Sequence, residues 1–222
     1  MLFEIYEKLL SVYGRQGWWP VTPEGQVEPE YTGGPDNFSQ RFEVAVGAIL
    51  TQNTTWKNAS LAIENLNMAG LLSPGAIQAA GLQELAETIR GSGYYNQKAE
   101  RLKRLAAHLS EETSPTRESL LALNGIGPET ADSIMLYGYG EPYFVIDAYT
   151  RRIYSRVGLV KGDEPYDEIR LMFERNLPRR ADLYQEFHAL IVEHAKRHCH
   201  PREPICLTCA IAQCCDFKEN RE

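Results

Sequence analysis

The sequence predicts an all-α protein, and three observations favour this class. Apolar residues recur at helical spacing through most of the 222 residues, Gly or Pro stands at most of the joins, and alternating strand patterns are scarce. Residues 143–146 are the only short apolar run that resembles a strand. Helices are expected over residues 2–13, 42–50, 56–68, 83–89, 97–109, 117–123, 129–137, 149–157, 166–176 and 181–194.

The first two helices each lead into a polar segment. Residues 14–34 form a Gly/Pro-rich stretch that predicts a loop, and residues 51–54 break the pattern before the next helix. Tryptophan usually packs in a core, but here all three tryptophans lie in or beside these polar segments. They are Trp18 and Trp19, which precede Pro20, and Trp56, which follows Gln52 and Asn53.

A glycine-rich turn joins two helical segments near the middle of the chain. Its two glycines flank an isoleucine and permit a tight hairpin that another surface can approach closely. Pro128 suits the first position of the following helix, whose exposed N–H groups could bind a phosphate. An ordinary turn between helices is the alternative. The hairpin residues are Leu123, Asn124, Gly125, Ile126 and Gly127.

Asp147 stands between the apolar run 143–146 and the helix expected from Tyr149. An Asp at a helix start is a good N-cap, which is worth typically ~1 kcal/mol. Capping would also fix the carboxylate for catalysis. The position alone leaves both roles open.

The charge and the apolar pattern limit the class of protein. The net charge of −7 lacks the basic excess that is common in duplex-binding proteins, although basic residues gather locally, so charge favours neither side. No segment resembles a signal peptide or the ~20 apolar residues that span a bilayer. We therefore expect a soluble, cytoplasmic protein with no membrane partner, in which structural disulfides are rare.

Four cysteines near the end follow the spacing C-x6-C-x2-C-x5-C, and the rest of the chain contributes only Cys214. Such clustering usually indicates a metal centre. Zinc ligands more often come as paired C-x2-4-C knuckles, and this stretch has one such pair, so an iron–sulfur cluster is favoured over zinc. The predicted ligands are Cys199, Cys206, Cys209 and Cys215, with Cys214 left over.

The hairpin, an Asp about twenty residues later and the cysteine spacing together resemble the endonuclease III superfamily of DNA glycosylases, from about Phe42 to Cys215. The resemblance implies a two-lobed helix-hairpin-helix fold with a DNA-reading cleft. The first lobe would be a helical barrel over residues 40–137, with its hairpin near 123–128. The second would combine residues 1–39 and 138–222, with a 4Fe–4S cluster holding the loop 199–215. The implied partner is double-stranded DNA that contains a damaged base, bound by a nucleoid-associated monomer.

One residue departs from the bifunctional members of this superfamily. They carry a lysine two residues after the second hairpin glycine, where it attacks the sugar carbon and lets the strand be cut. This chain has Glu129 there, and a carboxylate cannot form the imine that this chemistry needs. We therefore expect a monofunctional enzyme with weak or absent lyase activity.

Four short patterns, W-W-P, L-T-Q-N-T plus an aromatic residue, G-I-G-x-E and V-x-D, are similar to the 3-methyladenine DNA glycosylase branch. There the matching aromatics line the pocket for the flipped base, and the matching Glu and Asp lie in the active site. An alkylated purine is cationic, and an aromatic cage attracts a cation by ~0.5–2 kcal/mol per contact. Carried over, the pocket would use Trp18, Trp19, Pro20 and Trp56, and the catalytic residues would be Glu129 and Asp147.

Asp147 would stabilise the developing sugar oxocarbenium ion or orient water onto it. Gln52 and Asn53 would fill the gap that the flipped nucleotide leaves, unless they are ordinary turn residues. Two alternatives remain open. The enzyme could act on thymine or uracil opposite guanine, or on oxidised pyrimidines. The chain could also be a DNA-binding iron–sulfur protein without glycosylase activity.

Overall fold

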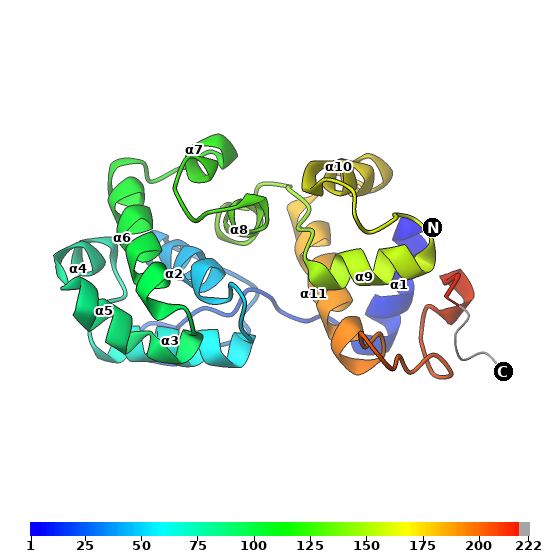
Figure 1. Ribbon diagram of the computed structural model, residues 1–222, viewed down its shortest axis with the longest axis horizontal. Helices are drawn as coiled ribbons and strands as arrows, with labels where there is room; N and C mark the ends of the chain where they lie inside the picture. The colour runs from blue at the N-terminus through cyan, green and yellow to red at the C-terminus, as the bar shows by residue number, and fades with distance from the viewer. Residues whose placement is uncertain (218–222) are drawn as a thin grey trace. The chain divides into compact units, whose positions relative to one another are not determined.

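The computed structural model describes residues 1–217, and the all-α prediction is confirmed (Figure 1). Within that range the only β pairing is an isolated bridge between Val21 and Glu30. The short helical turns are η1 (Arg90–Ser92), η2 (Ile134–Gly138, a π-helix) and η3 (Ala212–Cys214). The α-helices are α1 (Leu2–Tyr13), α2 (Phe38–Leu50), α3 (Trp56–Met68), α4 (Pro74–Ala79), α5 (Leu82–Thr88), α6 (Tyr95–Glu111), α7 (Arg117–Leu121), α8 (Pro128–Ser133), α9 (Ala148–Val157), α10 (Tyr166–Asn176) and α11 (Ala181–Arg197).

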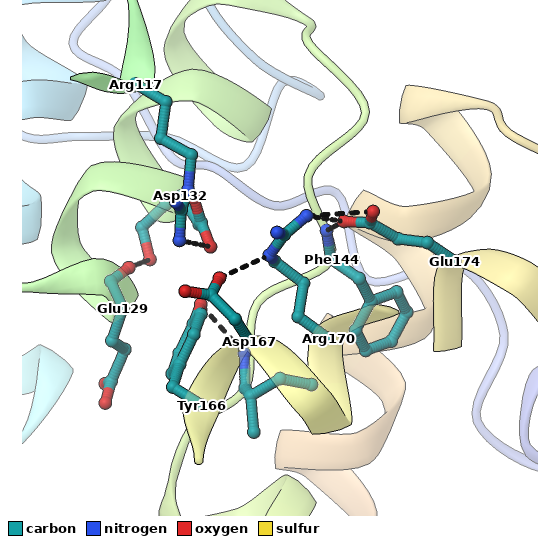
Figure 2. Close-up of polar contacts among 10 residues, drawn as sticks. Arg117, Glu129, Asp132, Phe144, Tyr166, Asp167, Arg170 and Glu174 are labelled. Atoms are coloured by element: carbon teal, nitrogen blue, oxygen red, sulfur yellow. Dashed lines mark hydrogen bonds and ion pairs between the residues drawn. The ribbon is translucent and has the colours of Figure 1, made fainter. Parts of the chain in front are cut away.

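Two local features differ from the expected pattern. Helix α4 was not predicted, because its six residues are too few to show a helical repeat. Residues 143–146 are extended but form no strand. Instead, the Phe144 N–H donates to Glu174 Oε1 at 3.0 Å, which Figure 2 shows. The Ile146 N–H donates to the Tyr166 hydroxyl at 3.3 Å. Side chains of α10 therefore accept the backbone N–H groups that a neighbouring strand would otherwise pair with.

The chain divides into two compact units. The hairpin unit is Gly17–Glu141, and the cysteine unit combines Met1–Gln16 with Pro142–Glu222, of which residues 218–222 lie outside the described range. These units differ from the expected boundaries in two segments, because residues 17–39 and 138–141 belong with the hairpin unit. Thr22 holds residues 17–39 there, since its N–H and its hydroxyl both donate to the buried Glu43 carboxylate of α2, at 2.9 and 2.8 Å.

Helix α2 is the centre of the hairpin unit. Its residues from Phe42 to Leu50 are all buried, and it packs against α3, α6 and η2. The side chain of Asn37 caps its start by accepting the Gln40 N–H at 3.0 Å. Figure 1 shows α4 and α5 beside α6, on which both pack.

A fully buried lysine joins two parts of this core. Lys98 on α6 has no exposed surface, and its ammonium donates to the Leu50 carbonyl at 2.8 Å and the Ser92 carbonyl at 2.7 Å. Leu50 ends α2, where backbone carbonyls lack helical partners. Burial, with a smaller contribution from Arg101, lowers the pKa of Lys98 from 10.5 to about 8. The side chain therefore ties the end of α2 to the turn before α6.

Replacing this lysine should destabilise the hairpin unit. Lys98→Met leaves two buried carbonyls without their donor, and we expect a loss of about 2–4 kcal/mol in the free energy of unfolding. Between pH about 8 and 10.5 the unfolded chain binds more protons than the native protein, so the wild type gains stability there and the variant does not. Urea unfolding at pH 7 and pH 9.5 measures both effects, with the exposed Lys57→Met as control. A Lys98 variant as stable as the control would contradict this role.

The cysteine unit packs around α11. Helices α1 and α9 both contact it, and Tyr154, Phe144, Phe173 and Phe187 form a fully buried aromatic core. Phe144 stacks on Phe173 with ring centroids 4.4 Å apart. Across the described part of the chain, no helix is long and apolar enough to cross a membrane.

Candidate active site and cysteine pocket

The tryptophans that the sequence assigns to a base pocket gather in the hairpin unit. The ring centroids of Trp18 and Trp56 lie 4.9 Å apart, and Trp19 lies 5.4 Å from Trp56. Two tyrosines that sequence reasoning missed extend the cluster, because Tyr31 contacts Trp18 at 5.7 Å and Tyr137 contacts Trp19 at 5.3 Å. Tyr137 is far from the tryptophans in sequence, and Tyr31 lies in the same loop as Trp18 but outside the W-W-P pattern, so no short pattern pointed to either.

The members of this cluster differ in exposure. Trp19 is only 6% exposed and Pro20 is buried beside it, whereas Trp18 and Trp56 are half-buried. Gly47 of α2 makes room for Trp19, since a Cβ there would lie 3.1 Å from the indole ring. Trp18 and Trp56 meet edge to face at 68°, which leaves no slot for a base between them. Trp18 and Trp56 are therefore the members that a base could reach, by stacking on an outer face or by parting the two rings.

The two hairpin glycines have different reasons to be glycine. Gly125 has φ +93°, and a Cβ there would overlap the Arg101 side chain, so both its backbone conformation and its packing favour glycine. Gly127 has an ordinary φ of −90° and open space at its Cβ position. Ile126 is buried, Leu123 is half-buried, and Asn124 is exposed at the turn. Gly127 thus leaves the start of α8 open to a close approach.

Gln52 is tied to the hairpin. Its amide donates to the Gly125 carbonyl at 3.2 Å and to the Thr130 hydroxyl at 2.9 Å, and Arg101 donates to its carbonyl oxygen at 2.5 Å. Asn53 is exposed and has φ +54°, a backbone state that Asn tolerates better than most residues. Gln52 therefore braces the hairpin in this structure, and Asn53 is the more accessible of the two at this turn.

A buried ion pair supports the helices on either side of the hairpin. Arg117 of α7 donates to Asp132 of α8 at 2.6 Å, and the Asp132 side chain has no exposed surface. Glu129 lies one turn earlier on α8, is exposed, and extends away from this pair in Figure 2. Ser133 donates to the Glu129 carbonyl at 2.7 Å. Glu129 is thus presented on a well-fixed helix start.

Asp147 is the N-cap of α9 in the cysteine unit. Its Oδ1 accepts the Thr150 N–H at 2.7 Å, its Oδ2 lies 3.5 Å from His188 Nε2, and its side chain is 13% exposed. Burial alone would raise the pKa of Asp147, but the contacts with His188 and Thr150 outweigh burial and lower it. The carboxylate is therefore ionised at neutral pH and held in one orientation.

A polar network fixes the segment that leads to Asp147. Arg170 of α10 donates to Asp167 at 3.0 Å and to both Glu174 oxygens at 2.9 Å, as Figure 2 shows. Glu174 in turn accepts the Phe144 N–H. Since Phe144 lies three residues before Asp147, α10 indirectly positions the carboxylate.

The four cysteines with the predicted ligand spacing line one pocket of the cysteine unit. Ile153, Val157 and Ile211 supply apolar walls. Within residues 1–217, no three His, Cys, Asp or Glu side chains are arranged to hold a single metal ion. Cys214 does not line the pocket, and its sulfur lies 3.9 Å from Glu4. The four cysteines of the predicted ligand set thus share one pocket, and Cys214 does not.

Two arginines of α9 hold the cysteine loop. Arg152 donates to the Cys199 carbonyl at 2.9 Å. Arg156 donates to the Cys199 sulfur at 3.1 Å and to the carbonyls of His200 and Pro201, both at 2.8 Å. Both arginines therefore bind the cysteine loop. Fewer basic side chains are left to bind a polyanion than the number of Lys and Arg residues in the sequence indicates.

The sequence of this protein matches a known family and several known proteins. Residues 46–179 match the profile described as HhH-GPD superfamily base excision DNA repair protein. A candidate DNA repair glycosylase of Methanocaldococcus jannaschii is 42% identical, with 97% of this chain and 96% of that protein covered. Endonuclease III of Sulfolobus acidocaldarius is 31% identical, with 79% and 82% covered.

Solved structures agree on the fold. The 3-methyladenine DNA glycosylase of H. pylori, bound to 1,N6-ethenoadenine, superposes with a TM-score of 0.72 at 30% identity, covering 88% of this chain and 97% of that one. An endonuclease III–DNA complex superposes with a TM-score of 0.78 at 19% identity, covering 98% and 96%. This second similarity concerns the fold alone.

Proposed function

Because the chain belongs to the HhH-GPD superfamily of base excision DNA repair proteins, we propose that it is a monofunctional DNA glycosylase that removes alkylated purines such as 3-methyladenine. It would bind double-stranded DNA as a monomer, flip the damaged nucleotide out of the stack, and leave an abasic site. The observation that carries the proposal is the carboxylate of Asp147, which is ionised, is held in place as the N-cap of α9 and is slightly exposed.

The chemistry asks little of the enzyme beyond capture and charge stabilisation. Alkylation at N3 or N7 makes the purine cationic, which weakens its glycosidic bond and makes the base a good leaving group. The bond electrons leave with the base, and positive charge develops on the sugar. Asp147 would stabilise that charge or orient the attacking water. Its lowered pKa supports this role, because the ionised form both attracts a cation and can accept a proton from the attacking water.

The aromatic cluster supports a cationic base as the substrate. Trp18 and Trp56 present partly exposed indole rings, and the electron-rich faces of such rings attract cations. A pocket for neutral pyrimidines would depend more on polar contacts to the base edge. The relative from H. pylori, whose name states 3-methyladenine, supports the same substrate.

The hairpin supports a phosphate contact. Gly127 leaves the start of α8 uncovered, where backbone N–H groups and the helix dipole favour an anion. Asn53, exposed at the turn beside Gln52, would enter the space that the flipped nucleotide vacates. These contacts would offset a net charge of −7 that does not favour DNA.

The cysteine pocket fits a 4Fe–4S cluster. Such a cluster takes one thiolate on each iron, so its four ligands lie around one space, and Cys199, Cys206, Cys209 and Cys215 all line one pocket. Their spacing, with a single C-x2-C pair, also favours this cluster over zinc. When bound, the cluster would cross-link the loop 199–215 and so hold it in place.

Base release from a panel of DNAs tests the proposal. The panel holds methylated duplex, guanine mismatches with thymine and with uracil, and duplex with oxidised thymine. We expect release of 3-methyladenine and no release from the others. Activity on the mismatches or the oxidised thymine alone would contradict the assigned role of the tryptophans. No release from any duplex, by protein with its cluster loaded, would favour a DNA-binding protein without glycosylase activity.

A further inference from the structure

Three side chains form a continuous polar chain that ends at the cysteine pocket. The Tyr13 hydroxyl of α1 lies 2.8 Å from Nδ1 of His194, on α11, and 2.9 Å from Nδ1 of His198, the C-cap residue of that helix. The other ring nitrogen of His194, Nε2, lies 3.5 Å from the Cys209 sulfur. His194 is only 1% exposed, so water does not compete for these contacts.

The hydrogen bonds of these three side chains run in one direction, toward Cys209. A cysteine that binds iron is a thiolate and brings no proton, so His194 Nε2 must carry the hydrogen that joins it to Cys209. In a neutral ring Nδ1 then has a lone pair and accepts the Tyr13 O–H. The Tyr13 oxygen in turn accepts the N–H of His198 Nδ1. Every donor has one acceptor, and the last donor points at the thiolate.

We propose that Tyr13, His194 and His198 form a directed hydrogen-bond chain that donates to the Cys209 thiolate and raises the reduction potential of the bound cluster. A hydrogen bond to a ligand sulfur withdraws electron density from it and so favours the more reduced state of the cluster. The hydroxyl of Tyr13 keeps the His194 ring in the tautomer that can donate, which is the usual task of a ligand's outer partner. This inference rests on the proposed iron–sulfur cluster.

A second donor reaches the pocket but offers a less specific test. Arg156 donates to the Cys199 sulfur at 3.1 Å, yet the same guanidinium also holds the carbonyls of His200 and Pro201. Changing Arg156 would therefore disturb the loop as well as the sulfur. Among residues 1–217, the His194 side chain bonds to Tyr13 and Cys209 and to no loop carbonyl.

Two amide substitutions of His194 separate donation to sulfur from packing. The Gln amide reaches the position of Nε2, so His194→Gln can still donate to Cys209. The shorter Asn reaches only the position of Nδ1, so His194→Asn can contact Tyr13 but not the sulfur. The measurement is the reduction potential of the loaded protein without DNA. Iron and sulfide content is determined first, and His108→Gln and His108→Asn on α6 serve as matched controls.

We expect His194→Asn to shift the potential to more negative values, His194→Gln to stay close to the wild type, and the controls to show no shift. Tyr13→Phe, which removes the hydroxyl that orients the His194 ring, should shift it in the same direction by a smaller amount. Equal potentials for the two His194 variants would overturn the proposal, as would a Tyr13→Phe variant at the wild-type value. A wild-type protein that contains no iron or sulfide would overturn the cluster assignment itself, a result distinct from an unshifted potential.

Discussion

Asp147→Asn should abolish base release while leaving DNA binding largely intact. Asparagine is as good an N-cap as aspartate, so the Thr150 N–H keeps its acceptor and α9 keeps its start. The substitution removes the negative charge that would stabilise the sugar cation, and it also changes the contact with His188. We expect the rate of release to fall by at least about a hundredfold, with a change of less than about 1 kcal/mol in the free energy of unfolding.

Single-turnover release of 3-methyladenine and the Kd for an abasic-site duplex measure the two effects separately. Asp163→Asn, an exposed position in the same unit, is the control. In the wild type the rate should fall with pH only below the ordinary range of an aspartate, because His188 and Thr150 lower the pKa of Asp147 against the effect of burial. Equal losses of binding and release would make Asp147 a purely structural cap.

The wild-type protein should form no covalent adduct when borohydride is added on abasic DNA. Borohydride traps only an imine between an amine and the sugar, and Glu129 stands where bifunctional members have their lysine. Restoring the amine with Glu129→Lys should give at most trace trapping and strand cleavage. The Glu129 side chain is exposed, so a lysine there would not gain the desolvation that makes an amine nucleophilic.

Glu118→Lys, an exposed position on α7, makes the same charge change away from the start of α8 and is the control. A robust adduct with wild-type protein would overturn the monofunctional assignment. Efficient cleavage by Glu129→Lys would show that the surrounding site is already built for lyase chemistry.

The helices could be predicted because each buries one face, so apolar residues recur in the sequence at helical spacing. Helices α1, α3 and α10 begin and end at the predicted residues. Helix α4 was missed because six residues hardly complete a repeat, and residues 143–146 resembled a strand because they are buried and extended. The backbone of this segment is bonded to the side chains of Glu174 and Tyr166, and sequence periodicity cannot predict such contacts.

The site was less accessible to sequence reasoning than the helices. Short patterns pointed to the tryptophans and to Asp147, but Tyr31 and Tyr137 join the aromatic cluster only through folding. The role of Gln52 also could not be predicted from the sequence. It donates to Gly125 and Thr130 and accepts from Arg101, and all three are distant in sequence, so only the structure shows that it braces the hairpin.

The most direct test of a monofunctional alkylpurine glycosylase is methylated duplex incubated with the wild-type protein, with strand breaks scored before and after alkali. The account predicts that free 3-methyladenine appears and that breaks appear only after alkali, because the enzyme leaves intact abasic sites. Breaks without alkali, in step with base release, would contradict it.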